Sequence, residues 1–192
     1  MGETENGFLL ELAREAYADG RFEDAERACR GLLADNPDHP DGLVLLGGIQ
    51  IVRDDNKEAV RILKSATELR PDAVTAWQWL AEALTRLERF HDSVRVLRQA
   101  LKLEPDNTTL LRMMGRSYMG YGDVNRAAQC FHRCLELDQD VPQALLGLGI
   151  CFYRDARYGQ ALDTLLRFVK LDPENLIGRI YLANALLHSG QL

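Results

Sequence analysis

The stretch that decides the fold is LRMMGRSYMGYGDVNRAAQCF, residues 111–131. Before the turn at Gly122, four residues at helical spacing share one face: Leu111, Met114, Gly115 and Tyr118. After the turn, Ala127 is small enough to let a second helix approach the first closely at Gly115. The stretch therefore predicts two amphipathic helices folded against each other. One such hairpin cannot bury its own apolar faces, so copies should stack on either side.

The hairpin recurs at a period of 34 residues. A large apolar residue followed by a very small one occurs six times, at Leu12-Ala13, Leu46-Gly47, Leu80-Ala81, Met114-Gly115, Leu148-Gly149 and Leu182-Ala183. The second helix keeps the same period through Ala25, Ala59, Ser93, Ala127 and Ala161, followed four residues later by Cys29, Leu63, Leu97, Phe131 and Leu165. Its end is marked by Pro37, Pro71, Pro105, Gln139 and Pro173. Proline suits this place because it cannot continue a helix.

This 34-residue pattern resembles the tetratricopeptide repeat (TPR) family. The resemblance covers nearly the whole chain, as five full repeats and the first helix of a sixth. Trp77 stands where the family has its tryptophan, and Tyr118 and Phe152 stand where it has its tyrosine. The departures are local: Ala16 and Gln50 replace that tyrosine, and Gln139, with Pro142 just beyond, replaces a proline. The resemblance implies an all-α fold, a right-handed α-solenoid of stacked helix-turn-helix hairpins.

The expected organisation is a short lead, residues 1–5, and a single solenoid, residues 6–192. Its repeats are 6–39, 40–73, 74–107, 108–141, 142–175 and the partial repeat 176–192. Helices are expected at 6–19, 22–35, 40–53, 56–69, 74–87, 90–103, 108–121, 124–137, 142–155, 158–171 and 176–189. The last of these presents an apolar stripe, which suggests either a longer array or self-association through 176–192.

Composition argues against several classes of protein. Hydrophobic residues at 46% and charged residues at 27% are ordinary for a globular chain, and no apolar run approaches the ~20 residues that span a bilayer. The formal net charge of -6 argues against a nucleic-acid backbone binder. The acidic N-terminus, where a signal peptide would be basic, favours a cytoplasmic protein.

The sequence contains no recognisable catalytic motif, so an enzyme, a cofactor and a metal site are not expected. Gly147-Leu148-Gly149 lies inside a helical repeat without a preceding strand, which argues against a dinucleotide loop. Cys130 and Cys134 lie one turn apart, but His132 between them points elsewhere and cannot share a zinc site with both. The four cysteines are interpreted as small buried hydrophobes.

The resemblance implies a partner-binding groove lined by the first helix of each repeat. The residues proposed for it are Arg14, Tyr17, Gln78, Trp79, Arg86, Arg112, Met113, Arg116, Tyr153 and Arg154. The same helical phases also contain Val44, Gly48, Ile51 and Ile150. Arg112 and Arg116, one turn apart, could form a fork for carboxylates of an acidic partner. Alternatively, these arginines are only solvated or paired with neighbours, and Trp79 only covers a neighbouring helix.

Binding is therefore the expected activity. The lysines, asparagines and arginine with which one TPR subclass holds the acidic tails of heat-shock chaperones fit no register of this chain. We expect a non-catalytic protein–protein interaction scaffold that holds a peptide or extended protein segment. The alternative is a substrate-selecting region of a larger enzyme, such as a glycosyltransferase, sulfotransferase or peptidase. An RNA-reading helical repeat is disfavoured by the acidic net charge and by the absence of base-reading polar pairs.

Overall fold

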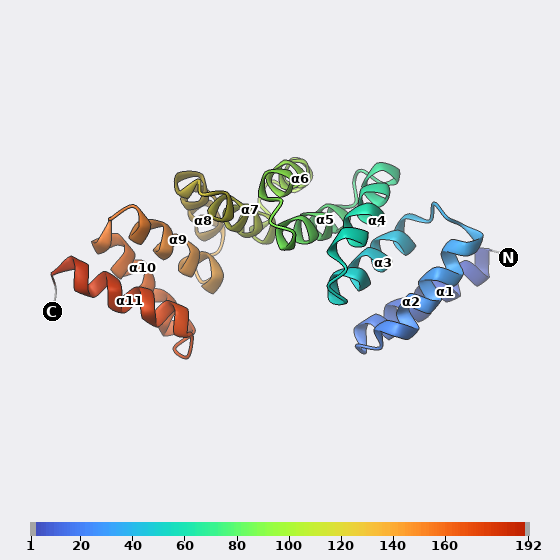
Figure 1. Cartoon of the computed structure of the whole chain (residues 1–192), viewed down its shortest axis with the longest axis horizontal. Coiled ribbons are helices and arrows are strands. Elements are labelled where there is room, and N and C mark those ends of the chain that lie inside the picture. The colour runs from blue at the N-terminus through green and yellow to red at the C-terminus, as the bar shows by residue number, and fades with distance from the viewer. Residues whose placement is uncertain (1–2, 191–192) are drawn as a thin grey trace. The chain divides into compact units, whose positions relative to one another are not determined.

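The computed structural model describes residues 3–190, which form helices joined by short turns (Figure 1). Within that range there are eleven helices and no strand. Their bounds are α1 Glu3–Ala18, α2 Phe22–Asp35, α3 Pro40–Val52, α4 Asn56–Leu69, α5 Val74–Arg86, α6 Phe90–Leu103, α7 Thr108–Tyr121, α8 Val124–Leu137, α9 Pro142–Arg154, α10 Tyr158–Leu171 and α11 Leu176–Ser189.

The helices confirm the predicted pattern, and all but α1 begin and end within one residue of it. Helix α1 begins at Glu3, three residues before its predicted start, so residues 3–5 belong to the helix. Met1 and Gly2 lie outside the described residues. The expected second-helix ends also hold, because Pro37 and Pro173 each lie two residues beyond the end of α2 and α10.

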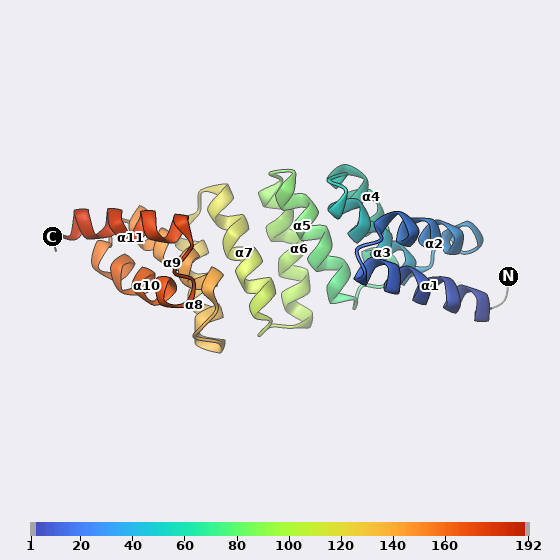
Figure 2. The same ribbon diagram turned by 90° about the horizontal axis from the view of Figure 1, so that it is seen from below.

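The chain divides into two compact units, one ending at Leu103 and the other starting at Glu104. The first holds three hairpins, α1–α2, α3–α4 and α5–α6, and the two helices of the last lie side by side in both views (Figures 1 and 2). The second holds the hairpins α7–α8 and α9–α10, with α11 packed on α10. Each unit is a solenoid-like stack of helical hairpins.

First helices and second helices pack differently in these stacks. In the first unit α1 contacts α3 and α3 contacts α5, and in the second α7 contacts α9 and α9 contacts α11. By contrast, no close backbone approach joins the described parts of α2, α4 and α6 to one another, or α8 to α10. The first helices of a unit therefore form a continuous layer, whereas the second helices stand apart.

Each first helix is followed within two residues by one residue in the left-handed region, again at a period of 34. Glycine occupies the position at Gly20, Gly122 and Gly190, with φ of 75°, 93° and 69°. The other three positions are Asp54, Glu88 and Ala156, with φ of 61°, 56° and 57°. A Cβ atom disfavours this conformation, so these three turns store strain that the glycine turns avoid.

Replacing Ala156 by glycine should relieve that strain. We expect the free energy of unfolding to rise by about 0.5–1 kcal/mol, because the loss of strain exceeds the extra entropy of a glycine in the unfolded chain. Gly122→Ala, the reverse change in an equivalent turn, should lower it by a similar amount. Urea denaturation of both variants checks this, and a destabilised Ala156→Gly protein would contradict the assignment of strain.

Small residues on first helices receive the largest side chains of second helices. A Cβ added to Gly115 of α7 would lie 2.7 Å from the Phe131 ring of α8, and one added to Gly147 of α9 would lie 2.5 Å from the same ring. Phe131 is buried between these two glycines. The predicted close approach at Gly115 is confirmed, and Gly147 belongs to the core rather than to any ligand loop.

A buried polar cluster explains the departure at Gln50. Glu26 of α2 is buried, and its carboxylate accepts a hydrogen bond of 2.8 Å from the Gln50 side-chain amide of α3. It also pairs with Arg53 and with Arg30, the latter at 2.8 Å. Most other repeats place Val60, Val94 and Leu162 at the Glu26 position. Two contacting residues are therefore both polar where most other repeats have apolar ones. They are Gln50 of the second hairpin and its hydrogen-bond partner Glu26 of the first.

Candidate partner-binding surface

The first unit carries a pocket of about 410 Å³ between its three first helices. We call it the first-unit pocket, and its lining residues are Arg14, Asp41, Val44, Leu45, Arg70, Asp72, Ala73, Thr75 and Trp79. Arg14 comes from α1, Asp41 from α3 and Trp79 from α5, so three successive repeats contribute. Arg14 and Trp79 were both predicted to belong to a groove, and the structure brings them to one pocket.

Trp79 forms an apolar wall of this pocket and packs on its neighbours. Its ring occupies the space beside Gly48 of α3, where a Cβ would overlap it. It also lies 6.0 Å from the ring of Tyr17, which in turn contacts Phe22 at 5.5 Å. Burial raises the pKa of Tyr17. Trp79 is thus half-buried and fixed in orientation, so it covers a neighbouring helix and lines the pocket at once.

The other tryptophan has a separate place. Trp77 donates its indole N–H to the carbonyl oxygen of Pro71 at 2.8 Å, which ties α5 to the turn that precedes it. Trp77, at the family's tryptophan position, therefore has a structural role in this repeat. Trp79, not Trp77, lines the first-unit pocket.

Charged groups surround the pocket in pairs. Arg70 makes two hydrogen bonds with the carboxylate of Asp41 across the pocket wall. Arg14 pairs with Glu11 at 2.9 Å, and its side chain remains 51% exposed at the rim. Arg70 was not expected here because it follows the last residue of α4, where helical phase predicts nothing. A guanidinium at the rim and an aromatic wall can together bind a side chain and a carboxylate.

Two further predicted residues lie elsewhere in this unit. Arg86 donates to the carbonyl oxygen of Ile51 at 3.2 Å and pairs with Glu82 at 3.1 Å. Its positive charge thus lies at the C-terminal end of α3, where the helix dipole makes a cation stabilising. Arg86 and the half-buried Gln78 do not line the first-unit pocket.

The second unit holds the other predicted residues. Arg112 and Arg116 lie one turn apart on α7, and Arg154 is exposed at the end of α9. Burial raises the pKa of the Cys134 thiol, and the nearby charge of Arg112 opposes that rise. Met113, by contrast, is only 5% exposed, so its expected place on an open surface was wrong.

Tyr153, the remaining predicted residue, belongs to an aromatic cluster that joins three helices. Its ring lies 5.6 Å from Tyr158 of α10 and 5.5 Å from Tyr181 of α11. His188 stacks on Tyr158 at 4.9 Å. These rings pack on one another, so Tyr153 holds α11 against repeat five.

Several apolar residues in the groove phases are buried. These are Val44, Gly48, Ile51 and Ile150. All four were expected to face the groove. For Gly48, Ile51 and Ile150 that expectation was wrong because each first helix packs against the next first helix of its unit, whereas Val44 lines the first-unit pocket. The solvent-exposed surface of the first helices is therefore narrower and more polar than the groove predicted from the sequence.

The cysteines are not activated as nucleophiles. All four cysteines are buried and free, and burial raises the pKa of Cys29 to about 12 and of Cys151 to about 11. Thiols with such pKa values are protonated at neutral pH and are poor nucleophiles. Over residues 3–190, no group of three or more His, Cys, Asp or Glu side chains is placed to hold a metal ion.

Comparisons with protein families agree with the geometry. Three family models described as tetratricopeptide repeat match residues 16–84, 74–117 and 112–175, and together they span most of the chain. The chain is a TPR protein. A search of curated protein sequences found no match. Within the part that the structure describes, no helix is long and apolar enough to cross a membrane.

Solved TPR structures share the fold at low sequence identity. MamA from Desulfovibrio magneticus RS-1 is 17% identical with a TM-score of 0.82, over 92% of this chain and 99% of that chain. TTC0263, a thermophilic TPR protein from Thermus thermophilus, is 24% identical with a TM-score of 0.70, over 95% and 99%. YrrB is 18% identical with a TM-score of 0.77, over 96% and 91%. At these identities the likeness concerns the fold alone.

Proposed function

We propose that this TPR protein is a non-catalytic interaction scaffold that binds a peptide or extended protein segment on its layer of first helices. The observation that carries the proposal is the first-unit pocket, where Arg14, Asp41 and Trp79 from three successive repeats line one cavity. A cavity of about 410 Å³ accommodates one or two side chains rather than a whole domain. YrrB, a TPR protein of the same fold, has an unusual peptide-binding site.

The chemistry of the surface favours a partner with both carboxylates and an apolar side chain. Trp79 offers an apolar wall to a side chain, and the exposed guanidinium of Arg14 offers a charge-assisted hydrogen bond to a carboxylate. In the second unit, Arg112 and Arg116 are placed one turn apart on α7, which suits two successive carboxylates. An acidic peptide with an aromatic or aliphatic residue fits these features.

Binding of acidic peptides should depend on salt and on these arginines. The probes are fluorescein-labelled Asp- and Glu-rich 15-residue peptides that contain one Phe or Leu, with matched Asn- and Gln-rich peptides. We expect the affinity for the acidic peptides to fall at least ~10-fold between ~50 and ~500 mM salt, because screening shortens the range of the ion pairs. Fluorescence anisotropy measures the dissociation constants at both salt concentrations.

Two variants localise the effect. Arg14→Glu should weaken binding by about 10-fold, and Arg112→Glu with Arg116→Glu should weaken it at least as much. The matched control is Arg95→Glu with Arg98→Glu, which makes the same charge change on the exposed side of the second helix α6. An affinity indifferent to salt and to the groove variants would refute the acidic-peptide assignment. Equal losses in groove and control variants would show a non-specific charge effect.

A further inference from the structure

A large cavity of the second unit lies between its two second helices. It consists of two adjoining parts of about 620 and 500 Å³ that share five residues: His132, Glu136, Leu148, Phe152 and Gln160. Helix α8 forms one wall and α10 the other, and Leu148 and Phe152 of α9 form an apolar floor. We call this cavity the α8–α10 groove.

The groove is open because one wall residue is small. Ala128 of α8 lines it, whereas the equivalent positions in repeats one and two carry Glu26 and Val60, both buried. The residues equivalent to Phe152 in repeats two and three are Gln50 and Leu84, which are 7% and 1% exposed. Phe152 itself is half-buried. The Phe152 ring is therefore less covered between second helices than the residues at its equivalent positions.

Two arginines stand at the ends of the groove. Arg157 lies over the Phe152 ring at 4.5 Å and donates to the side chain of Gln160. Arg167 donates to the carbonyl oxygen of Gln139 at 2.8 Å. The Asp155 carboxylate lies 3.9 Å from Arg157, and the acidic residues Glu136 and Asp163 also line the groove. Ten residues separate the arginines along α10, or ~15 Å at 1.5 Å per helical residue.

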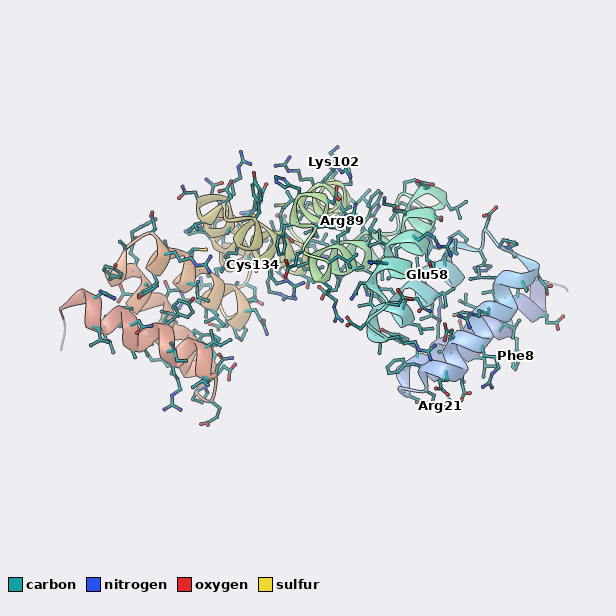
Figure 3. All side chains as sticks on the ribbon, viewed as in Figure 1. Phe8, Arg21, Glu58, Arg89, Lys102 and Cys134 are labelled. Atoms are coloured by element: carbon teal, nitrogen blue, oxygen red, sulfur yellow. The ribbon has the colours of Figure 1, made fainter. Side chains whose placement is uncertain are left out.

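Helix α1 presents an apolar face at positions that later first helices pack against the preceding second helix. Phe8 is 67% exposed and Leu12 is 38% exposed, and Phe8 lies on the outer side of α1 (Figure 3). The equivalents of Phe8 in later repeats include Gly42 and Gly178, which lie against Leu32 and Phe168 of the preceding second helix. In α1 this face has no such helix over it within the described residues.

Acidic residues flank this face at a matching distance. Glu5, Phe8, Leu12 and Glu15 follow at intervals of three, four and three residues, so all four share one side of α1. Glu5 and Glu15 are exposed and form no ion pair among the described residues. They too are ten residues, or ~15 Å, apart. The first 39 residues contain ten Asp or Glu and four Arg, which equals the whole net charge of -6.

We propose that a second copy of this chain occupies the α8–α10 groove through its helix α1. Phe8 and Leu12 of one copy enter the groove above Phe152, and Glu5 and Glu15 meet Arg157 and Arg167. The apolar residues, and the charge and spacing of these four charged side chains, match between the two surfaces. Because the two surfaces differ, each copy carries one of each and can bind a second copy at either surface.

The concentration dependence of the oligomeric state, and two single variants, test this proposal on the 192-residue protein. In analytical ultracentrifugation, the average mass should rise between ~10 and ~500 µM and should fall again in ~500 mM salt. Phe8→Glu removes the apolar side chain from α1 and should make the protein monomeric. Ala128→Leu fills the groove and should do the same, and the equivalent Leu162 shows that the fold accepts leucine there.

Mixing the two variants gives the diagnostic result. Each variant keeps one intact surface, so an equimolar mixture should form heterodimers and nothing larger. A wild-type protein that stays monomeric at ~500 µM would overturn the proposal. Oligomers that persist in both variants would also overturn it, and would assign self-association to the exposed apolar residues of α11, such as Ile180 and Leu187. Circular dichroism verifies that each variant is folded.

A charge exchange gives an independent check. Glu5→Lys with Glu15→Lys, and separately Arg157→Glu with Arg167→Glu, should each weaken association at least ~10-fold. Mixing these two doubly substituted proteins should restore it, because each contact then pairs opposite charges again. Glu68→Lys with Glu104→Lys, the same charge change at sites outside both surfaces, should leave association unchanged. Failure of the mixture to associate would contradict the pairing of these charges.

Discussion

Gly115→Leu is expected to lower the free energy of unfolding by about 3 kcal/mol, the upper end of the usual cost of overpacking a core. The Phe131 ring already lies where a Cβ on Gly115 would be, at 2.7 Å. The ring cannot retreat toward α9, because Gly147 lies against its other side. A leucine would therefore have to separate α7 from α8, and the loss would spread to the packing of α9.

A matched substitution isolates this cause. Gly159→Leu makes the same chemical change near the start of α10, where a Cβ would meet nothing within 4 Å. It should leave stability unchanged or raise it, because leucine is a better helix former than glycine. Urea denaturation followed by circular dichroism measures both variants. If Gly115→Leu unfolds at the same urea concentration as the wild type, the position of Phe131 between the two glycines is wrong.

Most of the fold could be predicted because the 34-residue pattern depends on short-range rules. Helical phase and the turn at Gly122 were enough to place α7 and α8 correctly, and Gly115 indicated where they approach. The positive φ of Glu88 and Ala156 was not anticipated, because neither residue type favours that conformation. There the stack imposes the conformation against local preference.

The binding surface could be predicted only in part, because helical phase describes one helix at a time. It identifies residues that do not face the hairpin partner, but not those covered by the next first helix. Met113 and Ile150 were misplaced for that reason. Arg70 was missed because it lies after a helix end, and the α8–α10 groove was missed because it depends on Ala128 being smaller than its equivalents. These features require the spatial arrangement of several repeats.

Glu26→Ala is expected to lower the free energy of unfolding by about 2–3 kcal/mol, although alanine suits a helix well. The Glu26 carboxylate is the acceptor for the buried amide of Gln50, and it also holds Arg53 and Arg30. Removing the carboxylate leaves that amide without its partner in the interface between the first two hairpins. An unsatisfied buried polar group lowers stability by more than a single hydrogen bond contributes. Glu23→Ala, on the exposed first turn of the same helix, should cost less than about 0.5 kcal/mol.

The other repeats supply the compensating change. Val60 occupies the position of Glu26 in repeat two, and Leu84 occupies the position of Gln50 in repeat three; both are buried. Combining Glu26→Val with Gln50→Leu removes both polar partners at once, so no buried group is left unsatisfied. We expect the double variant to recover at least half of the stability lost by Glu26→Ala, since replacing a buried polar pair by packed apolar residues is often neutral. Additive losses in a double-mutant cycle, measured by urea denaturation of Glu26→Val, Gln50→Leu and the combination, would show that the two side chains act independently and would contradict this account.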